Sequence, residues 1–322
     1  MVNLARVNSL SGWPSARGQI EATVLSVMGP IASKDRVELQ TKTVDELSFP
    51  GYVRRRVNYF VDEWDRVSAW LFVPERKDEM PAILCCHSAV PQGKDETAGL
   101  DGEPLMALAQ HYAELGYVTL APDCITAGDR ISTGLAPYDT KSFYKDYPKM
   151  SAMGKMLSDH MYAVDVLCEV KRVDSARIAV VGHGMGAANA LFLAAFDERI
   201  QACVASCGFT RFAADKNPER WAPDSGFIYL PLLRDAVKKG EFPFDWEHIL
   251  ALLAPSPTLI VTALNDPIHS NTKSCEKAVQ LASTVYKLLG APEALGHFMH
   301  EGGHRMMPEV LEVADEWFER WL

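Results

Sequence analysis

The sequence predicts an α/β fold built on a mostly parallel, doubly wound sheet, and two observations lead to this prediction. The first is a pair of strand-like runs, YVRRRVNYFV and RVSAWLFVP, separated by a short polar turn, which suits an antiparallel hairpin. The second is that the chain then alternates between short apolar runs and helical patterns. Such alternation is typical of βαβ units, whose consecutive strands are parallel.

Each later element is predicted from a local pattern. Strands are expected at PAILCCH, YVTLAP, RIAVVGH, IQACVASCG and TLIVTAL, because short apolar runs of this kind occur in strands covered on both faces. Helices are expected over about 104–115, 156–170 and 272–289. A short run near Leu295 and the amphipathic helix PEVLEVADEWFERWL close the chain.

The chain is expected to form one main domain with two additions. Residues 1–45 are predicted to be a helical extension, because Ile20, Val24, Leu25 and Met28 recur at helical spacing. Residues 46–322 are expected to be the α/β domain. Within it, residues 209–254 are rich in Trp, Phe, Tyr and Pro and lie where a cap over an active site would be inserted.

Composition and charge exclude several classes of function. The 322 residues carry a net charge of −10, which argues against a nucleic-acid or anionic-membrane partner and favours a small-molecule substrate. No secretory or membrane-spanning pattern occurs, so we expect a cytoplasmic protein. The seven cysteines follow no framework or metal-ligand spacing and are expected to be buried, reduced thiols. The oligomeric state stays open, a homo-oligomer included.

One stretch, RIAVVGHGMGAANALFL, organises the rest of the chain. A β-branched run breaks at GHGMG, and a helix of small residues begins at once, which predicts strand, sharp turn and helix. This pattern resembles the nucleophile elbow of α/β-hydrolases, G-x-S-x-G, whose central residue is held exposed at the top of the sheet. Here the central residue is Gly184.

Two further residues fit a catalytic triad, which in this fold follows the chain order nucleophile, acid, histidine. Asp266 directly follows the strand TLIVTALN, and His304 precedes the closing helix in HEGGHRMMPE. An aspartate that accepts from one ring nitrogen fixes the histidine tautomer and leaves the other nitrogen free as a base. His297 and His300 compete with His304 for this role.

The remaining site residues are predicted from their positions beside the elbow. An oxyanion hole needs two backbone N–H groups, and Met185 and Ser88 are the expected donors. The aromatic segment after the strand next to the elbow is expected to line the pocket. The side chains predicted to line the substrate pocket are His87, His183, Trp221 and Tyr229.

From about residue 52 to the end, the chain resembles the dienelactone hydrolase and acetyl xylan esterase-like branch of the α/β-hydrolases. The blocks CCHSAVPQGKDETAGL, YVTLAPD, VDSARIAVVGHGMGAANALFLAAFDERIQACVASCGF, PFDWEHILALLAPSPTLIV and GGHRMMPEVLEVADEWFERWL carry the resemblance. It implies hydrolysis of carboxylic esters through an acyl-enzyme, with Asp266 and His304 as acid and base. The departure is Gly184, where that family has Ser or Cys.

Glycine has no side chain that could attack a carbonyl, and three interpretations stay open. The chain is a Ser-to-Gly form of a serine esterase, or the His304–Asp266 dyad activates water or abstracts a proton, or the protein binds a small molecule without catalysis. Cys86, Ser206 and Cys207 are poor substitutes, because none of them lies on an elbow. No cofactor is expected, because GHGMG lacks the dinucleotide spacing and the phosphate-loop Lys, and no metal is expected.

Overall fold

The computed structural model describes residues 1–31 and 37–322. Residues 32–36, which belong to the predicted extension, lie outside the described residues. The described chain forms a nine-stranded sheet in the order β1-β2-β3-β5-β4-β6-β7-β8-β9. Its strands are β1 (Lys42–Phe49), β2 (Tyr52–Phe60), β3 (Arg66–Pro74), β4 (Met80–Cys86), β5 (Val118–Pro122), β6 (Val173–His183), β7 (Ile200–Ser206), β8 (Thr258–Ala263) and β9 (Leu295–His300).

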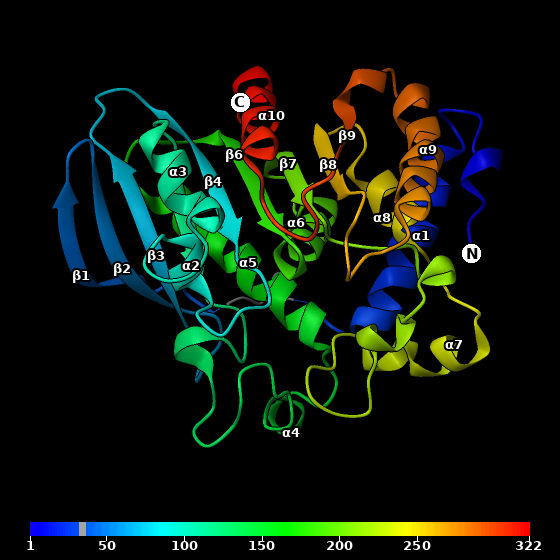
Figure 1. The fold of residues 1–322 in the computed structure, drawn as a ribbon, viewed down its shortest axis with the longest axis horizontal. Helices are drawn as coiled ribbons and strands as arrows, with labels where there is room; N and C mark the ends of the chain where they lie inside the picture. The colour runs from blue at the N-terminus through cyan, green and yellow to red at the C-terminus, as the bar shows by residue number, and fades with distance from the viewer. Residues whose placement is uncertain (32–36) are drawn as a thin grey trace.

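The sheet is antiparallel at one end and parallel over the rest, as predicted. Strands β1, β2, β3 and β5 pair antiparallel, whereas β5, β4, β6, β7, β8 and β9 pair parallel in that order. Strands β4, β5 and β8 are buried almost throughout, because helices cover both faces of the sheet. Figure 1 shows the sheet running from β1 at the left to β9 at the right.

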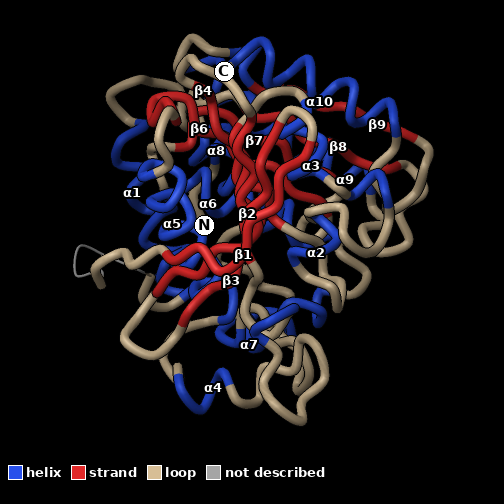
Figure 2. The backbone as a smooth tube through the Cα atoms, turned by 90° about the vertical axis from the view of Figure 1, so that its left-hand side faces the viewer, coloured by secondary structure: helices blue, strands red, loops and turns tan. Residues whose placement is uncertain are grey.

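Helices pack on the two faces and leave the carboxyl ends of the parallel strands free for loops. They are α1 (Trp13–Met28), α2 (Lys94–Thr97), α3 (Leu108–Glu114), α4 (Phe143–Asp146), α5 (Ala152–Glu169), α6 (Met185–Phe196), α7 (Arg234–Lys239), α8 (Trp246–Leu253), α9 (Thr272–Leu288) and α10 (Pro308–Trp321). One core layer contains buried residues of α1, α5, α6, α8 and α9, and the other contains those of α3 and α10. Figure 2 shows α5 and α6 on one side of the sheet and α3 and α10 on the other.

Two expectations about element boundaries need correction. The expected extension, residues 1–45, holds α1, but its last residues already belong to strand β1, which pairs with β2. The expected insertion, residues 209–254, includes α8, which is fully buried and packs in the core. The Asp245 side chain and the His248 side chain form a capping box at the start of α8, so the irregular segment ends before it.

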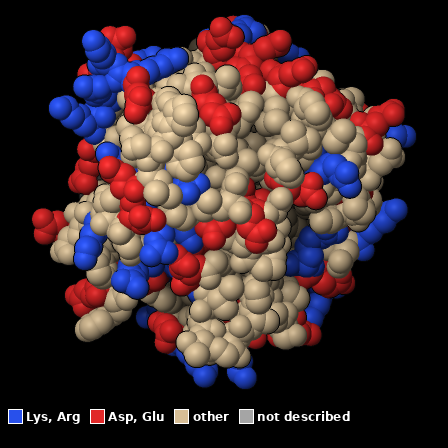
Figure 3. All heavy atoms as spheres, turned by 60° about the vertical axis from the view of Figure 1, so that its left-hand side comes forward, with Lys and Arg blue, Asp and Glu red and all other residues tan. Residues whose placement is uncertain are grey.

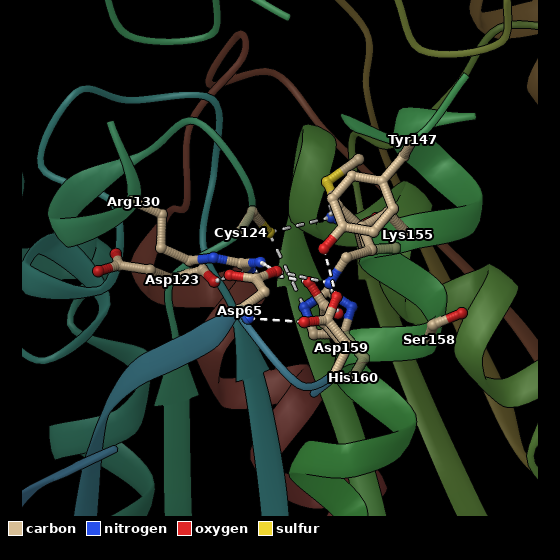
Figure 4. A network of polar contacts seen from close by, with 12 residues as sticks. Asp65, Asp123, Cys124, Arg130, Tyr147, Lys155, Ser158, Asp159 and His160 are labelled. Carbon is tan, nitrogen blue, oxygen red and sulfur yellow. Dashed lines mark hydrogen bonds and ion pairs between the residues drawn. The ribbon is translucent and has the colours of Figure 1, made fainter. Parts of the chain in front are cut away.

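A buried ionic network ties the hairpin formed by β2 and β3 to helix α5 (Figure 4). Asp159 accepts from Lys155 Nζ at 2.6 Å and from Arg130 at 2.8 Å, and Asp65 accepts from Lys155 Nζ at 2.7 Å. The side chains of Asp159, Lys155 and Arg130 are at most 7% exposed. Because these charges are buried together, each one depends on its partners for compensation.

On the face drawn in Figure 3, acidic and basic side chains are interspersed. Among the described residues, no helix combines the length and the apolar character needed to cross a membrane.

Candidate active site

The chain turns sharply from β6 into α6 at residues 182–186, the elbow. A Cβ on Gly182 would lie 2.2 Å from the backbone of Gly186, and a Cβ on Gly186 would lie 2.1 Å from the carbonyl oxygen of Cys86. Both positions therefore exclude any side chain. Gly184 has φ +56 and ψ −119, a conformation that side chains rarely adopt and that a nucleophile elbow imposes on its central residue.

The predicted acid and base meet beside this turn. Asp266 lies in the loop after β8, His304 lies between β9 and α10, and His304 Nδ1 is 2.8 Å from Asp266 Oδ2. The other carboxylate oxygen accepts from the backbone N–H groups of Ile268 at 2.7 Å and His269 at 2.8 Å. Burial acts to raise the pKa of Asp266, but the hydrogen bond with His304 and the backbone donors outweigh it, and the pKa falls to about 2.

In the His304–Asp266 pair, the ring nitrogen of His304 that does not bond Asp266 faces Gly184 at the centre of the elbow. Because ionised Asp266 can only accept, the proton lies on His304 Nδ1 and the lone pair lies on Nε2. A Cβ on Gly184 would stand 3.0 Å from that Nε2 and 3.8 Å from Ser88 Oγ. Within the described chain, His304 Nε2 has no hydrogen-bond partner. The arrangement is that of a triad from which the nucleophilic side chain is missing.

The predicted oxyanion donors lie around the same position. Met185 opens α6, so its N–H has no carbonyl of a preceding turn to bond, and Ser88 lies in the loop after β4. Among the residues that the structure describes, neither the Met185 N–H nor the Ser88 N–H donates a hydrogen bond, and the same holds for the Ala89 N–H. Ser88 Oγ donates to the His183 carbonyl oxygen at 3.0 Å and holds this loop against the elbow.

A cavity of about 460 Å³ opens over Gly184 and His304. Its wall is mostly apolar and includes three of the four predicted pocket residues, His183, Trp221 and Tyr229. The two aromatic residues come from the irregular segment that follows β7, and their rings pack together with centroids 5.2 Å apart. Such a cavity, apolar with a few polar groups, is typical of small-molecule sites.

The fourth predicted pocket residue, His87, is placed elsewhere. It is 1% exposed and is not among the residues that line the cavity. Its Nε2 accepts from the Cys124 N–H at 2.9 Å, so Nδ1 carries the proton and donates to the Ser88 carbonyl oxygen at 2.6 Å. His87 therefore fixes the loop after β4 from within the core.

The competing histidines and the substitute nucleophiles have other partners. His297 Nε2 lies 3.0 Å from Thr262 Oγ1, and His300 Nδ1 accepts from the Gly302 N–H at 3.2 Å, so neither takes the place of His304 beside Asp266. Burial raises the pKa of Cys86 well above its ordinary value and that of Cys207 to about 12, which disfavours a reactive thiolate. Ser206 Oγ bonds His183 Nδ1 at 3.0 Å.

Some cavity residues were not predicted from the sequence. Glu96 is 5% exposed, and burial raises its pKa. One of its carboxylate oxygens is buried without a hydrogen-bond partner in the described part of the chain. Arg220 and His269 also line the cavity. All three lie in loops or short helical turns that show no periodic pattern, so only the folded loops bring them to the site.

Comparison with known proteins gives a family match over part of the chain. Residues 67–226, which include the elbow, match the dienelactone hydrolase family. The chain is 26% identical over 262 residues to YtaP of Bacillus subtilis (strain 168), a protein named for an inferred hydrolase activity; the match covers 78% of this chain and 82% of YtaP.

Solved structures of esterases share the fold. A glucuronoyl esterase from Solibacter usitatus superposes with a TM-score of 0.76 at 16% identity, covering 97% of this chain and 94% of that one. An acetyl xylan esterase from Paenibacillus sp. R4 gives a TM-score of 0.61 at 19% identity, covering 98% and 96% of the two chains. The chain therefore contains a dienelactone hydrolase family domain and has the α/β-hydrolase fold, a hydrolase scaffold whose elbow carries Gly184.

Proposed function

We propose that this protein is a nucleophile-deficient form of a serine esterase, with a small carboxylic ester as the molecule that its cavity accepts. The observation that carries the proposal is the position of Gly184. With this backbone conformation, a Cβ on Gly184 would lie 3.0 Å from His304 Nε2. The hydrogen bond between His304 and Asp266 is present as well.

Each remaining group has a role in acyl transfer. His304 would take a proton as general base, Asp266 holds its tautomer, and the N–H groups of Met185 and Ser88 would stabilise the oxyanion. Without a hydroxyl at residue 184, no acyl-enzyme forms by this route. Binding and the oxyanion donors alone support a rate about 10³ to 10⁴-fold above that in water, far below that of a complete triad.

Labelling with a fluorophosphonate tests the proposal, because only an activated hydroxyl in a working triad reacts with it. We expect no labelling of the unmodified chain and stoichiometric labelling of Gly184→Ser at residue 184. Gly184→Ala is the matched control, since it adds the Cβ without the hydroxyl. If Gly184→Ser folds but does not label, the proposed alignment of His304 with residue 184 is wrong.

A second candidate function uses the dyad without a nucleophile. His304 Nε2 faces the space beside Gly184, so a water molecule held there could lose its proton to the imidazole and attack an ester directly. Gly184→Ala distinguishes this function, because its methyl group fills the space. Under the dyad function the basal hydrolysis falls in Gly184→Ala and in His304→Ala, whereas a purely binding protein shows no hydrolysis to lose.

A further inference from the structure

Three potential metal ligands converge beside the elbow, and the catalytic proposal uses only one of them. The ligand atoms of His183, Cys207 and His304 all lie within 4.8 Å of one another. His183 ends β6, Cys207 directly follows β7, and His304 lies in the loop before α10, which reaches the ends of these strands (Figure 1). We propose that these three side chains bind one divalent transition-metal ion, with Zn²⁺ as the preferred ion.

The His183 ring points an unsatisfied nitrogen into this cluster. His183 is 2% exposed, and its Nε2 is buried without a hydrogen-bond partner among the described residues. Its other nitrogen, Nδ1, is 3.0 Å from Ser206 Oγ. Leaving a buried polar atom unsatisfied costs about 1–3 kcal/mol, so such an atom calls for an explanation. A metal ion that accepts the Nε2 lone pair supplies one.

The imidazoles of His183 and His304 are each held by a hydrogen bond to the Nδ1 atom. Asp266 bonds His304 Nδ1 at 2.8 Å, and Ser206 Oγ bonds His183 Nδ1 at 3.0 Å, so both Nε2 atoms are left for a shared ligand. Metal-bound histidines almost always have such a partner on the second nitrogen, most often a carboxylate, carbonyl or water. The ring centroids of the two histidines are 4.7 Å apart.

Cys207 completes the set in an unusual conformation. Its φ is +53, a value that is uncommon for a residue with a side chain, and strained backbone of this kind concentrates at functional sites. The thiol is 3% exposed and lies 4.0 Å from His300 Nε2. Although burial disfavours a free thiolate, a bound metal ion deprotonates its cysteine ligand outright.

Imidazole nitrogen and thiolate sulfur are both ligand types that Zn²⁺ accepts, and three protein ligands leave a fourth position open, as in catalytic zinc sites. With bond lengths of about 2.0–2.3 Å, tetrahedral ligand atoms stand about 3.3–3.7 Å apart, so separations of up to 4.8 Å must close by at most about 1.5 Å. Side-chain rotation of His304, which is 17% exposed, can supply this movement. The fourth position would face the cavity that His183 and His304 line.

Gly184 is what makes room for the ion. A Cβ at residue 184 would stand 3.0 Å from His304 Nε2, the atom proposed to bind the metal. A serine hydroxyl there would compete for the same lone pair. The sequence spacing of residues 183, 207 and 304 resembles no metal motif, which is why no metal was expected, but the sheet brings the ends of β6 and β7 together.

Metal binding is measured without turnover, so this proposal can fail independently of the proposed function. The chain is freed of metal with a chelator, and Zn²⁺ is titrated by calorimetry. Co²⁺ is added in a parallel experiment, because a thiolate bound to Co²⁺ gives a charge-transfer absorption band. We expect one ion per chain, the thiolate band, and a rise in the unfolding temperature on adding Zn²⁺.

Variants identify the ligands. Cys207→Ser should remove the thiolate band and weaken binding by at least about 10-fold, and Ser206→Ala should weaken binding by about 10-fold through the orientation of His183. Cys203→Ala is the control, because Cys203 is a buried cysteine within β7 that is not among the three proposed ligands, and it should bind like the unmodified chain. Gly184→Ser should weaken binding.

Three results would overturn the proposal. These are the absence of stoichiometric binding to the folded chain, a thiolate band that persists in Cys207→Ser, and equal loss of the band in Cys203→Ala and Cys207→Ser. Circular dichroism and thermal unfolding of each variant separate loss of a ligand from loss of the fold. None of these outcomes changes the fluorophosphonate result expected for Gly184→Ser, which concerns the metal-free chain.

Discussion

His304 Nε2 lies 3.0 Å from the point that a Cβ on Gly184 would occupy, closer than van der Waals contact usually allows. A side chain at residue 184 therefore requires the imidazole to shift by a few tenths of an ångström. Asp266 holds the other side of the ring at 2.8 Å, and Gly303, with φ +74, precedes His304 in a loop that can yield. The close contact at residue 184 is thus relieved by a small shift of one imidazole, whereas the φ of +56 keeps the backbone strained for any side chain there.

We predict that Gly184→Ser gains esterase activity. The metal-free, unmodified chain should hydrolyse p-nitrophenyl acetate only at the low residual rate that binding and the oxyanion donors support, and Gly184→Ser should raise that rate by at least about 10³-fold, the scale on which triad nucleophiles matter. The double variant G184S/H304A should lose the gain, and Gly184→Ala should show none. Initial rates under matched conditions decide the matter. Brisk turnover by the unmodified chain, unchanged in Gly184→Ser, would place the reacting group elsewhere.

Most of the sheet and the dyad could be predicted from the sequence, because the signals are local. Apolar runs mark β4 to β8, and chain order singles out Asp266 and His304 once the elbow is found. Strand β1 was not predicted, because its side chains are exposed and show no alternation. It is held by backbone pairing with β2. This segment is therefore a strand because it pairs with β2, and its own sequence pattern does not predict it.

The site residues that were missed or misplaced depend on tertiary contacts. The His87 side chain is directed by the N–H of Cys124, which is 37 positions away in the chain. Glu96 and His269 reach the cavity through loop conformations that no periodicity encodes. Likewise, His183, Cys207 and His304 converge only because parallel strands end at the same edge of the sheet.

We predict that stability falls as the pH drops below about 6.5. Burial lowers the pKa values of His160, His183 and His269 to about 3, so these side chains stay neutral in the folded chain while the unfolded chain binds protons from about pH 6.5 downward. The contribution of these histidines to the free energy of unfolding is fully present above pH 6.5. As the pH falls below this value, each histidine lowers the free energy of unfolding by up to about 1.4 kcal/mol per pH unit. Urea unfolding at pH 7, 6 and 5 measures the slope.

A single substitution checks the origin of this slope. His160→Gln removes one of the three groups and should reduce the pH dependence by about 1.4 kcal/mol per unit over this range. The substitution leaves the other two imidazoles in place, so part of the slope should remain. A free energy of unfolding that stays constant from pH 7 to 5 would show that the buried histidines take up protons in the folded state.

We predict that Asp159→Ala is strongly destabilising. The substitution leaves Lys155 and Arg130 buried beside a single remaining carboxylate, Asp65, and breaking a buried ion cluster in this way costs about 3–5 kcal/mol. Glu46→Ala is the control, because the Glu46–Arg55 pair is largely exposed and should contribute less than about 1 kcal/mol. Denaturant unfolding of both variants gives the comparison. Equal losses in the free energy of unfolding for the two variants would mean that water solvates the Lys155 and Arg130 charges when Asp159 is removed.

Two glycine substitutions, one in the elbow and one in helix α1, are predicted to have opposite effects on stability. A Cβ on Gly186 would meet the Cys86 carbonyl oxygen at 2.1 Å and the His87 carbonyl oxygen at 2.8 Å, and neither backbone atom can move without shifting β4. We expect Gly186→Ala to cost about 3 kcal/mol or more in the free energy of unfolding.

Gly18, inside helix α1, has nothing within 4 Å of its Cβ position, so Gly18→Ala should stabilise by about 0.5–1 kcal/mol. Chemical unfolding of the two variants measures both signs. If Gly186→Ala leaves the free energy of unfolding unchanged, the close packing between the elbow and β4 can relax. This packing would then not be what fixes residue 184 opposite His304.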